Sequence, residues 1–176
     1  MIAARRSRGM ALVLSMVVLI VLTILGAAVM SGSGFELRMS SNALDKNISF
    51  NDAEDLRGQA ETAVNAIVDR METNNVTFSA AASALGYGNG FYDNSGGGTV
   101  TTDVASFWDT PTNYRAVGAG GAGYVVEYIG VYAVYLDRTT APAGNDEQLM
   151  HVFRLTVMGR GATGALTAVQ AVYMRN

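Results

Sequence analysis

The hydrophobic positions of this chain fall into three blocks with different patterns. From Met10 to Phe35 the chain holds no charged residue, and the run MALVLSMVVLIVLTILGAAVM is almost wholly apolar. About 20 predominantly apolar residues are enough to cross a bilayer as a helix. Lipid requires every backbone polar group to be paired, and a helix achieves this internally. The pattern therefore predicts that residues 10–34 form a membrane-spanning helix.

After Phe35 the hydrophobic pattern changes its character but keeps a helical period. Large apolar residues recur at steps of three, four, seven or eight, and most charged residues lie between them. These apolar residues are Leu37, Leu44, Ile48, Leu56, Val64, Ile67 and Met71. No proline occurs between Met1 and Pro111, so one helix can continue from the first block into this one. The pattern predicts an amphipathic helix over residues 35–73, with its apolar face against a soluble domain.

A glycine- and serine-rich stretch, residues 26–34, joins the two halves of this helix. Each glycine inside a helix costs about 1 kcal/mol relative to alanine. We therefore expect the helix to be weakest here, and to kink or loosen when the protein assembles.

Residues 74–123 have little periodicity and many turn-forming residues. Glycine and asparagine gather at 86–90 and 94–98, in combinations that are typical of turns. A short helix is predicted over Ser79–Leu85. The region also contains aromatic residues that we expect to anchor it to the core, namely Phe91, Tyr92, Phe107, Trp108 and Tyr114.

The third block, at the C-terminus, has the two-residue alternation of half-buried strands. Tyr124–Leu136 is rich in β-branched and aromatic residues, and Gly130 within it is expected to mark a bulge. His151–Met158 and Leu166–Met174 alternate as well, and the glycine-rich turn between them predicts an antiparallel hairpin. The polar segment Asp137–Glu147 is predicted to be a loop. Together the blocks predict an α+β fold, in which the long N-terminal helix packs on a three- to four-stranded antiparallel sheet.

Composition and charge exclude several classes of function. The chain has no cysteine, which excludes disulfides, thiol catalysis and cysteine-based metal sites. Its single histidine, His151, cannot build a multi-histidine metal site. The net charge of −3 gives no bulk attraction to nucleic acid. We therefore predict no cofactor, no metal site and no enzymatic activity.

Two motifs that can carry chemistry lack the context that they need. Gly118–Gly123 (GAGGAG) matches the spacing of a dinucleotide-binding loop, but it precedes a predicted strand and no helix follows it. A Ser-His-Asp triad would depend on His151, and no G-x-S-x-G elbow occurs in the chain. We interpret the first motif as a loop and His151 as an ordinary strand residue.

The N-terminal residues carry three arginines and no acid before the apolar block, which favours a cytoplasmic N-terminus. The arginines are Arg5, Arg6 and Arg8, and Gly9 follows them. Three interpretations fit this arrangement: a secretory signal peptide cut after Gly26-Ala27-Ala28, an uncleaved signal anchor, or a leader cut at Gly9. The apolar run exceeds the roughly 7–15 residues of a signal peptide, which weighs against the first.

The junction of Arg8 and Gly9 with the apolar residues Met10–Leu14 resembles a prepilin N-terminus. More particularly, the chain is similar to the PilX family of type IV pilus minor pilins. The similarity rests on ELRMSSN at 36–42, Asp45-Lys46, FNDAEDL at 50–56 and Ala60-Glu61. The C-terminal FRLTV at 153–157, Gly159-x-Gly161 and the last strand through Val169–Val172 are similar to the family's closing hairpin.

The resemblance implies how the N-terminus is processed. Residues 1–9 would be a leader that a prepilin peptidase removes after Gly9, and the same enzyme would methylate the new N-terminus, Met10. Residues 10–34 would first span the membrane and then lie in the filament core, and residues 35–176 would form a soluble pilin-like domain. This domain would comprise the amphipathic helix 35–73, the loop region 74–123 and the antiparallel sheet 124–176.

The chain departs from the wider pilin pattern at Leu14. Most pilins have glutamate at the fifth mature position, which is Leu14 if cleavage follows Gly9. A buried charge without a partner is costly, so a subunit with no neighbour above it could do without that glutamate. Members of the PilX family and the tip pseudopilin of type II secretion often lack it. The family often has cysteines in its C-terminal domain, and this chain has none.

The resemblance implies a minor pilin that primes type IV pilus assembly and sits at or near the pilus tip. The implied location is the bacterial inner membrane, crossed once with the N-terminus in the cytoplasm, and then the pilus, which serves cell adhesion and twitching motility. The implied partners are other minor pilins, the major pilin, prepilin peptidase, the inner-membrane assembly platform, a large tip adhesin and, before assembly, membrane lipid, but no nucleic acid. Two alternatives remain open: a type II secretion tip pseudopilin, and a signal-anchored or secreted enzyme or binding domain.

Overall fold

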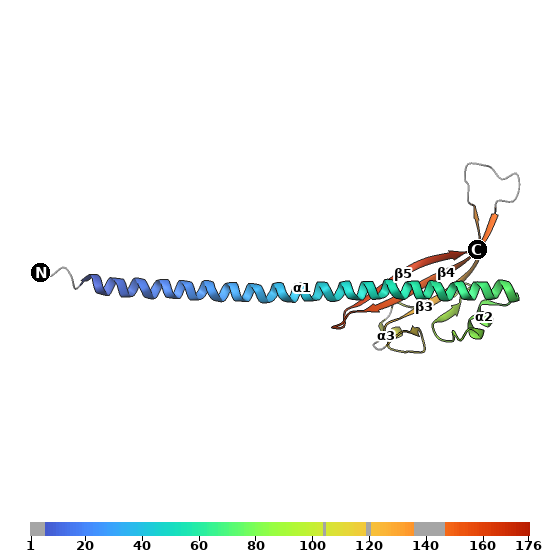
Figure 1. Cartoon of the computed structure of the whole chain (residues 1–176), viewed down its shortest axis with the longest axis horizontal. Helices are drawn as coiled ribbons and strands as arrows, with labels where there is room; N and C mark the ends of the chain where they lie inside the picture. Colours follow the sequence, from blue (N-terminus) through green and yellow to red (C-terminus); the bar gives the residue numbers. More distant parts are fainter. Residues whose placement is uncertain (1–5, 104, 119–120, 136–146) are drawn as a thin grey trace. The chain divides into compact units, whose positions relative to one another are not determined.

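The computed structural model describes residues 6–103, 105–118, 121–135 and 147–176. Its helices are α1 (Arg6–Asn74), α2 (Phe78–Ala84) and α3 (Ala105–Trp108). Its strands are β1 (Phe91–Asp93), β2 (Arg115–Ala116), β3 (Gly123–Tyr135), β4 (Glu147–Arg160) and β5 (Leu166–Arg175) (Figure 1). The predicted loop Asp137–Glu147 lies outside the described residues except for Glu147, where β4 begins. The chain divides into two compact units, Met1–Leu44 and Asp45–Asn176.

The helix α1 is continuous through the glycine- and serine-rich stretch 26–34. Gly26 and Gly34 have no neighbouring atoms within 4 Å of the position where a Cβ would stand. The glycines in this stretch therefore do not end the helix, and its loosening on assembly stays a prediction.

The predicted α+β fold is confirmed, but the sheet has five strands and is mixed rather than purely antiparallel. Its strand order is β1-β3-β4-β5, and the short β2 also pairs with β3. The two long hairpin pairings, β3 with β4 and β4 with β5, are antiparallel. The parallel pair is β1 with β3, where Phe91 lies opposite Val126. The predicted irregularity at Gly130 is confirmed by a register shift between Tyr128 and Gly130.

The path of the chain after α1, through α2 and a tight turn, places β1 parallel to β3. The helix α2, close to the predicted short helix, is capped by Thr77, whose hydroxyl accepts from the Ala80 N–H at 3.4 Å. The chain then enters β1 alongside β3, and Gly90, with a positive φ of 77°, makes the close turn possible. A Cβ on Gly90 would stand 2.8 Å from the Tyr124 carbonyl oxygen, so only glycine fits.

The core of the unit Asp45–Asn176 lies between α1, α2 and one face of the sheet. Aromatic rings fill its centre: Phe78 of α2 stacks on Tyr128 of β3 at 5.2 Å between ring centroids, and both contact Phe153 of β4. From α1 the core receives Ala53, Leu56, Ala60, Val64, Ile67, Val68 and Met71. The second half of the predicted apolar helix face is therefore confirmed.

The prediction that this apolar face packs on the domain was wrong for the first part of the segment 35–73. Leu37, Leu44 and Ile48 are exposed, and the buried stripe continues upstream of Ala53 through the polar residues Ser49 and Asp45 instead. The spacing of 45, 49 and 53 is helical, and it places these residues in line with Leu56 and Ala60. At Asp45 and Ser49 the stripe is polar because it contacts the backbone of the turn between β4 and β5 rather than side chains of the core.

We call this polar attachment the clasp, formed by Asp45, Ser49 and Asp52 of α1 with the turn between β4 and β5. The Asp45 carboxylate accepts from the N–H groups of Thr163 at 2.8 Å and Ala165 at 2.9 Å. The Ser49 hydroxyl lies 2.6 Å from that of Thr167, and Asp52 accepts from the Arg160 N–H at 2.8 Å. The clasp thus pairs backbone groups of the turn that the end of the hairpin would otherwise leave without protein partners.

Two glycines bring the hairpin close enough to α1 for these bonds. A Cβ on Gly159 would collide with the Ser49 carbonyl oxygen and the Ala53 backbone nitrogen. A Cβ on Gly161 would stand 2.5 Å from the Asp45 carbonyl oxygen. Hydrogen bonds to its carboxylate hold the pKa of Asp45 below its ordinary value. The Thr163 N–H has the largest effect, followed by the Thr163 hydroxyl and the Ala165 N–H.

The opposite face of the sheet is covered by the chain between β1 and β2. Of the predicted aromatic anchors, Trp108 and Tyr114 are buried and pack with Val125 of β3, while Tyr92 and Phe107 are half-buried against them. The fifth, Phe91, lies on the core side and packs partly buried against the main cluster. The aromatic anchoring predicted for this region is therefore confirmed.

A buried carboxylate ties this outer layer to the sheet. Glu127 of β3 is only 1% exposed, and its Oε1 accepts from Asn94 Nδ2 at 2.8 Å and from the Val100 N–H at 2.9 Å. Its Oε2 lies 3.6 Å from a guanidinium nitrogen of Arg154 in β4. The two hydrogen bonds to Oε1 and the nearby Arg154 charge offset part of the cost of burying this carboxylate, although Oε2 accepts no hydrogen bond from the described residues.

Candidate functional site along the N-terminal helix

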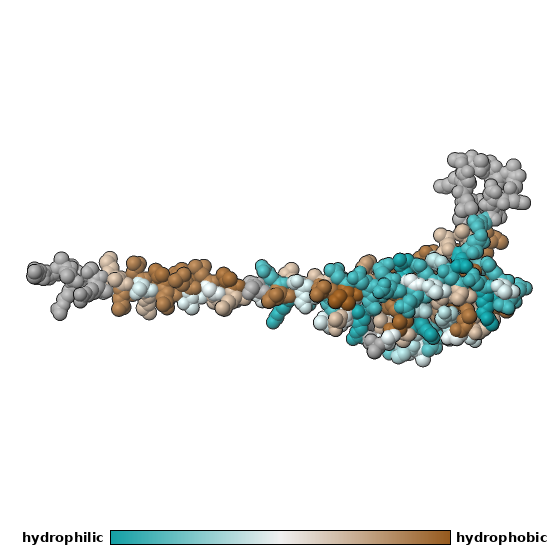
Figure 2. All heavy atoms as spheres, in the orientation of Figure 1, coloured by the Kyte–Doolittle hydropathy of each residue, from teal (hydrophilic) through white to brown (hydrophobic). Residues whose placement is uncertain are grey.

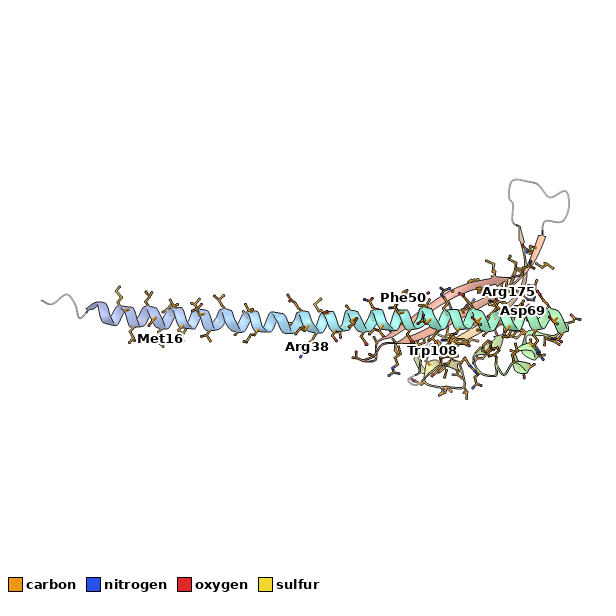
Figure 3. The ribbon with its side chains drawn as sticks, viewed as in Figure 1. Met16, Arg38, Phe50, Asp69, Trp108 and Arg175 are labelled. Carbon is orange, nitrogen blue, oxygen red and sulfur yellow. The ribbon has the colours of Figure 1, made fainter. Side chains whose placement is uncertain are left out.

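In the unit Met1–Leu44, α1 exposes a run of apolar side chains from Met10 to Met30. Every described large apolar side chain between Met10 and Leu44 is exposed, and Figure 2 shows them as a band of hydrophobic residues along the N-terminal half of the helix. Met16, labelled in Figure 3, points outward from the helix and is 63% exposed. Water does not favour so large an apolar surface, so it marks a site for lipid or for other apolar helices.

Two polar side chains of the apolar block, those of Ser15 and Thr23, bond to their own helix. The Ser15 hydroxyl donates to the Leu12 carbonyl at 2.9 Å, and the Thr23 hydroxyl donates to the Leu19 carbonyl at 2.7 Å. Such bonds pair the hydroxyl hydrogens within the helix. The segment can therefore enter an apolar environment without stranding a polar hydrogen.

By length and composition, α1 from Gly9 onward meets the requirements of a membrane-crossing helix. Its first charged residues after the apolar block are Glu36 and Arg38, and Figure 3 shows Arg38 pointing away from the helix. The apolar block thus has the length of a span and a charged boundary on its C-terminal side.

The structure places the three predicted site residues Gly9, Met10 and Leu14 in the first turns of α1. Met10 is 76% exposed and Leu14 is 66% exposed. Residues four apart lie one above the other on a helix, so Met10 and Leu14 share a face. A glutamate at position 14 would add a charge to this face, one turn from the predicted new N-terminus, whereas Leu14 keeps it apolar.

Comparison with known protein families finds a match at this end of the chain. Residues 8–54 match the family model described as PilX N-terminal. The N-terminal segment is PilX-like. The match confirms the resemblance seen in the sequence and, with the apolar helix, fits a membrane-anchored pilin. No curated protein and no solved structure matches the chain.

The PilX-like segment crosses the border between the two units. It begins at Arg8, just before the predicted cleavage point, and ends at Glu54. It therefore contains the exposed apolar helix and also the three α1 residues of the clasp, Asp45, Ser49 and Asp52. The segment carries both the apolar surface and the residues that attach α1 to the hairpin, which indicates a structural role in a pilin-like assembly.

The clasp was missed when the sequence was considered alone. The helical pattern of residues 35–73 places most charged residues between the apolar positions, where charged side chains are usually solvated, and nothing in it distinguishes Asp45 and Asp52 from the others. The available signal was the helical spacing of 45, 49 and 52 together with the closely spaced glycines 159 and 161. Short polar side chains in line with a buried stripe can indicate bonds to a backbone that approaches closely.

The other candidate residues are accounted for by ordinary contacts. His151 of β4 has its Nδ1 3.0 Å from the Tyr128 hydroxyl and its ring against that of Tyr128. Gly118 and Gly121 have positive φ, and the GAGGAG stretch leads into β3, although residues 119 and 120 lie outside the described part of the chain. Among the described residues, no three His, Asp or Glu side chains are grouped so as to hold a metal ion.

Proposed function

We propose that this protein is a minor pilin that primes type IV pilus assembly and sits at or near the pilus tip. The observation that carries the proposal is the PilX N-terminal match over residues 8–54, a segment that contains the exposed apolar side chains of α1 from Met10 to Met30. The role is mechanical: the protein contributes a helix to the filament core and a folded domain to its surface.

The proposed pathway begins in the bacterial inner membrane. Arg5, Arg6 and Arg8 keep the N-terminus in the cytoplasm, where prepilin peptidase cleaves after Gly9 and methylates Met10. Residues 10–34 then move from lipid into the filament core, among equivalent helices of other pilins. Because both environments are apolar, extraction does not require this surface to enter water.

Leu14 supports a position at the end of the filament. A subunit with no neighbour above it has no N-terminal amine to pair with a glutamate at this position, and a buried unpaired carboxylate would be unfavourable. The proposed partners are other minor pilins, the major pilin, the assembly platform and a tip adhesin. Co-purification with pilus components rather than secretion components separates this role from that of a type II secretion pseudopilin.

Mass spectrometry of the mature protein tests the proposal. We expect the N-terminal peptide to begin at Met10 and to carry one methyl group on its amine. A Gly9→Leu variant is the matched control, because a bulky residue before the scissile bond should leave the leader attached. A mature protein that begins at Val29, or that keeps Met1, would contradict the pilin proposal.

A further inference from the structure

A cavity of about 490 Å³ lies in the unit Asp45–Asn176, between α1 and the start of β3. Its walls come from α1, from the turn after α2, from β2 with the residues that follow it, and from β3. Its volume falls within the roughly 300–1,000 Å³ that is usual for small-molecule sites. No acidic residue is among the described residues that line it, and its polar side chains are those of Gln59, Thr62, Tyr87, Arg115 and Tyr124.

The strands β2 and β3 hold Arg115 and Tyr124 side by side. The two residues lie directly opposite each other in this antiparallel pair, so their side chains project to the same side of the sheet. Two glycines let the backbone of Arg115 pack closely. A Cβ on Gly90 would collide with the Arg115 backbone nitrogen, and a Cβ on Gly123 would collide with its carbonyl oxygen. Close packing therefore fixes the place of Arg115 at the cavity.

The guanidinium of Arg115 has no carboxylate partner among the described residues, since none of their ion pairs includes it. It lies 5.8 Å from the centroid of the Tyr87 ring, and its Nη1 donates to the Gly86 carbonyl in a long hydrogen bond of 3.5 Å. The Tyr87 ring stacks on Phe91, which meets Tyr124 edge-on. A guanidinium has five N–H groups, so most of those of Arg115 can donate to a ligand.

The Tyr124 hydroxyl is a second donor in the cavity. Tyr124 is only 4% exposed, and its hydroxyl bonds to none of the described residues. The hydroxyl is not one of the described polar atoms that are sealed from solvent, so it opens onto the cavity. Burial raises the pKa of Tyr124, the Tyr87 phenol raises it further and Arg115 lowers it, with no effect from any described acid. The hydroxyl therefore keeps its proton at neutral pH and can donate it.

The helix α1 adds an amide to the cavity but no charge. Gln59 is exposed, and its amide nitrogen bonds to no described residue. The Thr62 hydroxyl donates to its own helix at 2.8 Å, so its proton is already used. Asp55 lies one turn before Gln59 but does not line the cavity, and Glu61 pairs with Arg57. The available donors are thus one cation, one phenol and one amide, a set that suits a singly charged anion.

We propose that this cavity binds the carboxylate of a small organic acid or of a chain terminus. The planar guanidinium of Arg115 receives the carboxylate, and Tyr124 and Gln59 donate to its oxygens. One unpaired positive charge matches the single charge of a carboxylate, whereas a phosphate monoester carries about −1.5 to −2 at neutral pH. The inference rests on the unit Asp45–Asn176 alone and holds whether or not the protein belongs to a pilus.

An NMR titration of the full chain in detergent micelles tests this inference. The backbone amide signals of Ala116 and Gly118, which line the cavity, report binding. The probes are propionate and acetyl-dialanine with a free C-terminal carboxylate, and the matched control is acetyl-dialanine amide. We expect the amide to bind at least about tenfold more weakly than the acid, because it lacks the charged hydrogen bonds. Equal binding of the two carboxylates assigns the cavity to small acids, and a preference for acetyl-dialanine assigns it to chain termini.

Two variants with matched controls locate the carboxylate. Arg115→Gln removes the charge and should weaken binding about tenfold, and Tyr124→Phe removes only the hydroxyl and should weaken it about fivefold. Tyr132→Phe removes a hydroxyl from β3 where the side chain is 52% exposed, and Arg38→Gln removes a charge from a residue that does not line the cavity. Both controls should change binding less than about twofold. Circular dichroism confirms that the variants remain folded, and the comparison of acid with amide needs no variant.

Several outcomes would overturn the proposal. They are an absence of binding by both carboxylates, an amide that binds as tightly as the acid, and equal effects of Arg115→Gln and Arg38→Gln. Inorganic phosphate that binds more tightly than propionate would also overturn it, because the cavity would then not select a carboxylate. Since none of these readouts involves leader processing, their failure is distinguishable from failure of the proposed pilin function.

Discussion

The two halves of α1 belong to one helix but present opposite surfaces. Upstream of Asp45 all the large apolar side chains that the structure describes are exposed, whereas from Asp45 onward one stripe is buried against the sheet. Leu44 is 62% exposed, and Ile67, six turns further along, is fully buried. Hydrophobicity alone therefore does not decide which part of the helix enters the domain.

The difference shows what attaches a helix to a domain. Leu44 and Ile48 lie close in sequence to Asp45 and Ser49, yet the polar pair is buried and the apolar pair is not. The hairpin approaches α1 through Gly159 and Gly161, and at so short a distance there is room for backbone bonds but not for leucine side chains. The apolar residues left outside then need a partner from another molecule or from lipid.

The largest expected effect comes from truncating one apolar side chain in each half of α1. Ile67→Ala should lower the free energy of unfolding by about 2–5 kcal/mol, because it leaves a cavity in the core. Leu44→Ala should change it by less than about 0.5 kcal/mol, because that side chain is exposed. Urea unfolding in detergent, followed by the fluorescence of Trp108, measures both. Equal effects would contradict the division of the helix.

A charge in the apolar block should impair membrane insertion and leave the stability of the folded domain unchanged. Leu19→Arg places a charge near the middle of the predicted span, which disfavours membrane insertion by about 2.5–3.5 kcal/mol. We expect the variant protein to be lost from the membrane fraction while the domain in detergent keeps its unfolding midpoint. If Leu19→Arg inserts normally, residues 10–34 do not span the bilayer.

Adding a methyl group beside the clasp tests whether the hairpin packs closely against α1, with the same addition at an open position of α1 as the control. Gly159→Ala would force the hairpin away from the α1 backbone and should destabilise the domain by about 1–3 kcal/mol. Gly58→Ala adds the same methyl group to α1 where nothing lies within 4 Å, so it should stabilise the helix by up to about 1 kcal/mol. Opposite signs in the same urea experiment support the close approach, and a stabilising Gly159→Ala would refute it.

The smallest expected effect concerns the charge of Asp45. Because its pKa is lowered in the folded protein, its carboxylate stabilises the fold above the ordinary pKa near 3.8, and this contribution is lost as the pH falls through the lowered value. Asp45→Asn should therefore reduce stability at neutral pH and flatten its decline in acid. Unfolding midpoints between pH 7 and about pH 2 measure this. Parallel curves for the variant and the natural protein would show that Asp45 contributes no such dependence.

The sequence predicted those parts of the fold whose periodicity is long and regular. β4 and β5 alternate over many residues, and Leu56, Val64, Ile67 and Met71 repeat at helical spacing, so both were recognised. β1 and β2 have three and two residues, which is too short to show any alternation. The parallel pairing of β1 depends on the path of the chain after α2, which no local pattern encodes.

The candidate site was predicted in part for a similar reason. The apolar block is a local feature, and the PilX N-terminal match supports the interpretation of the segment that contains it. The roles of Gly9 and Leu14 within this segment stay predictions. The clasp joins residues more than a hundred positions apart, such as Asp45 and Thr163. Its bonds go to backbone N–H groups, which carry no sequence signature, so Asp45 looked like an ordinary solvated acid.

Cysteine labelling in intact membranes tests the division of α1 most directly, because the natural chain has no cysteine. Leu19→Cys, Leu44→Cys and Val68→Cys would each be exposed to a membrane-impermeant maleimide, before and after unfolding of the domain. We predict that lipid protects position 19 in both conditions, that position 44 is labelled at once, and that position 68 is labelled only after unfolding. Equal protection of positions 44 and 68 in the folded protein would contradict the account.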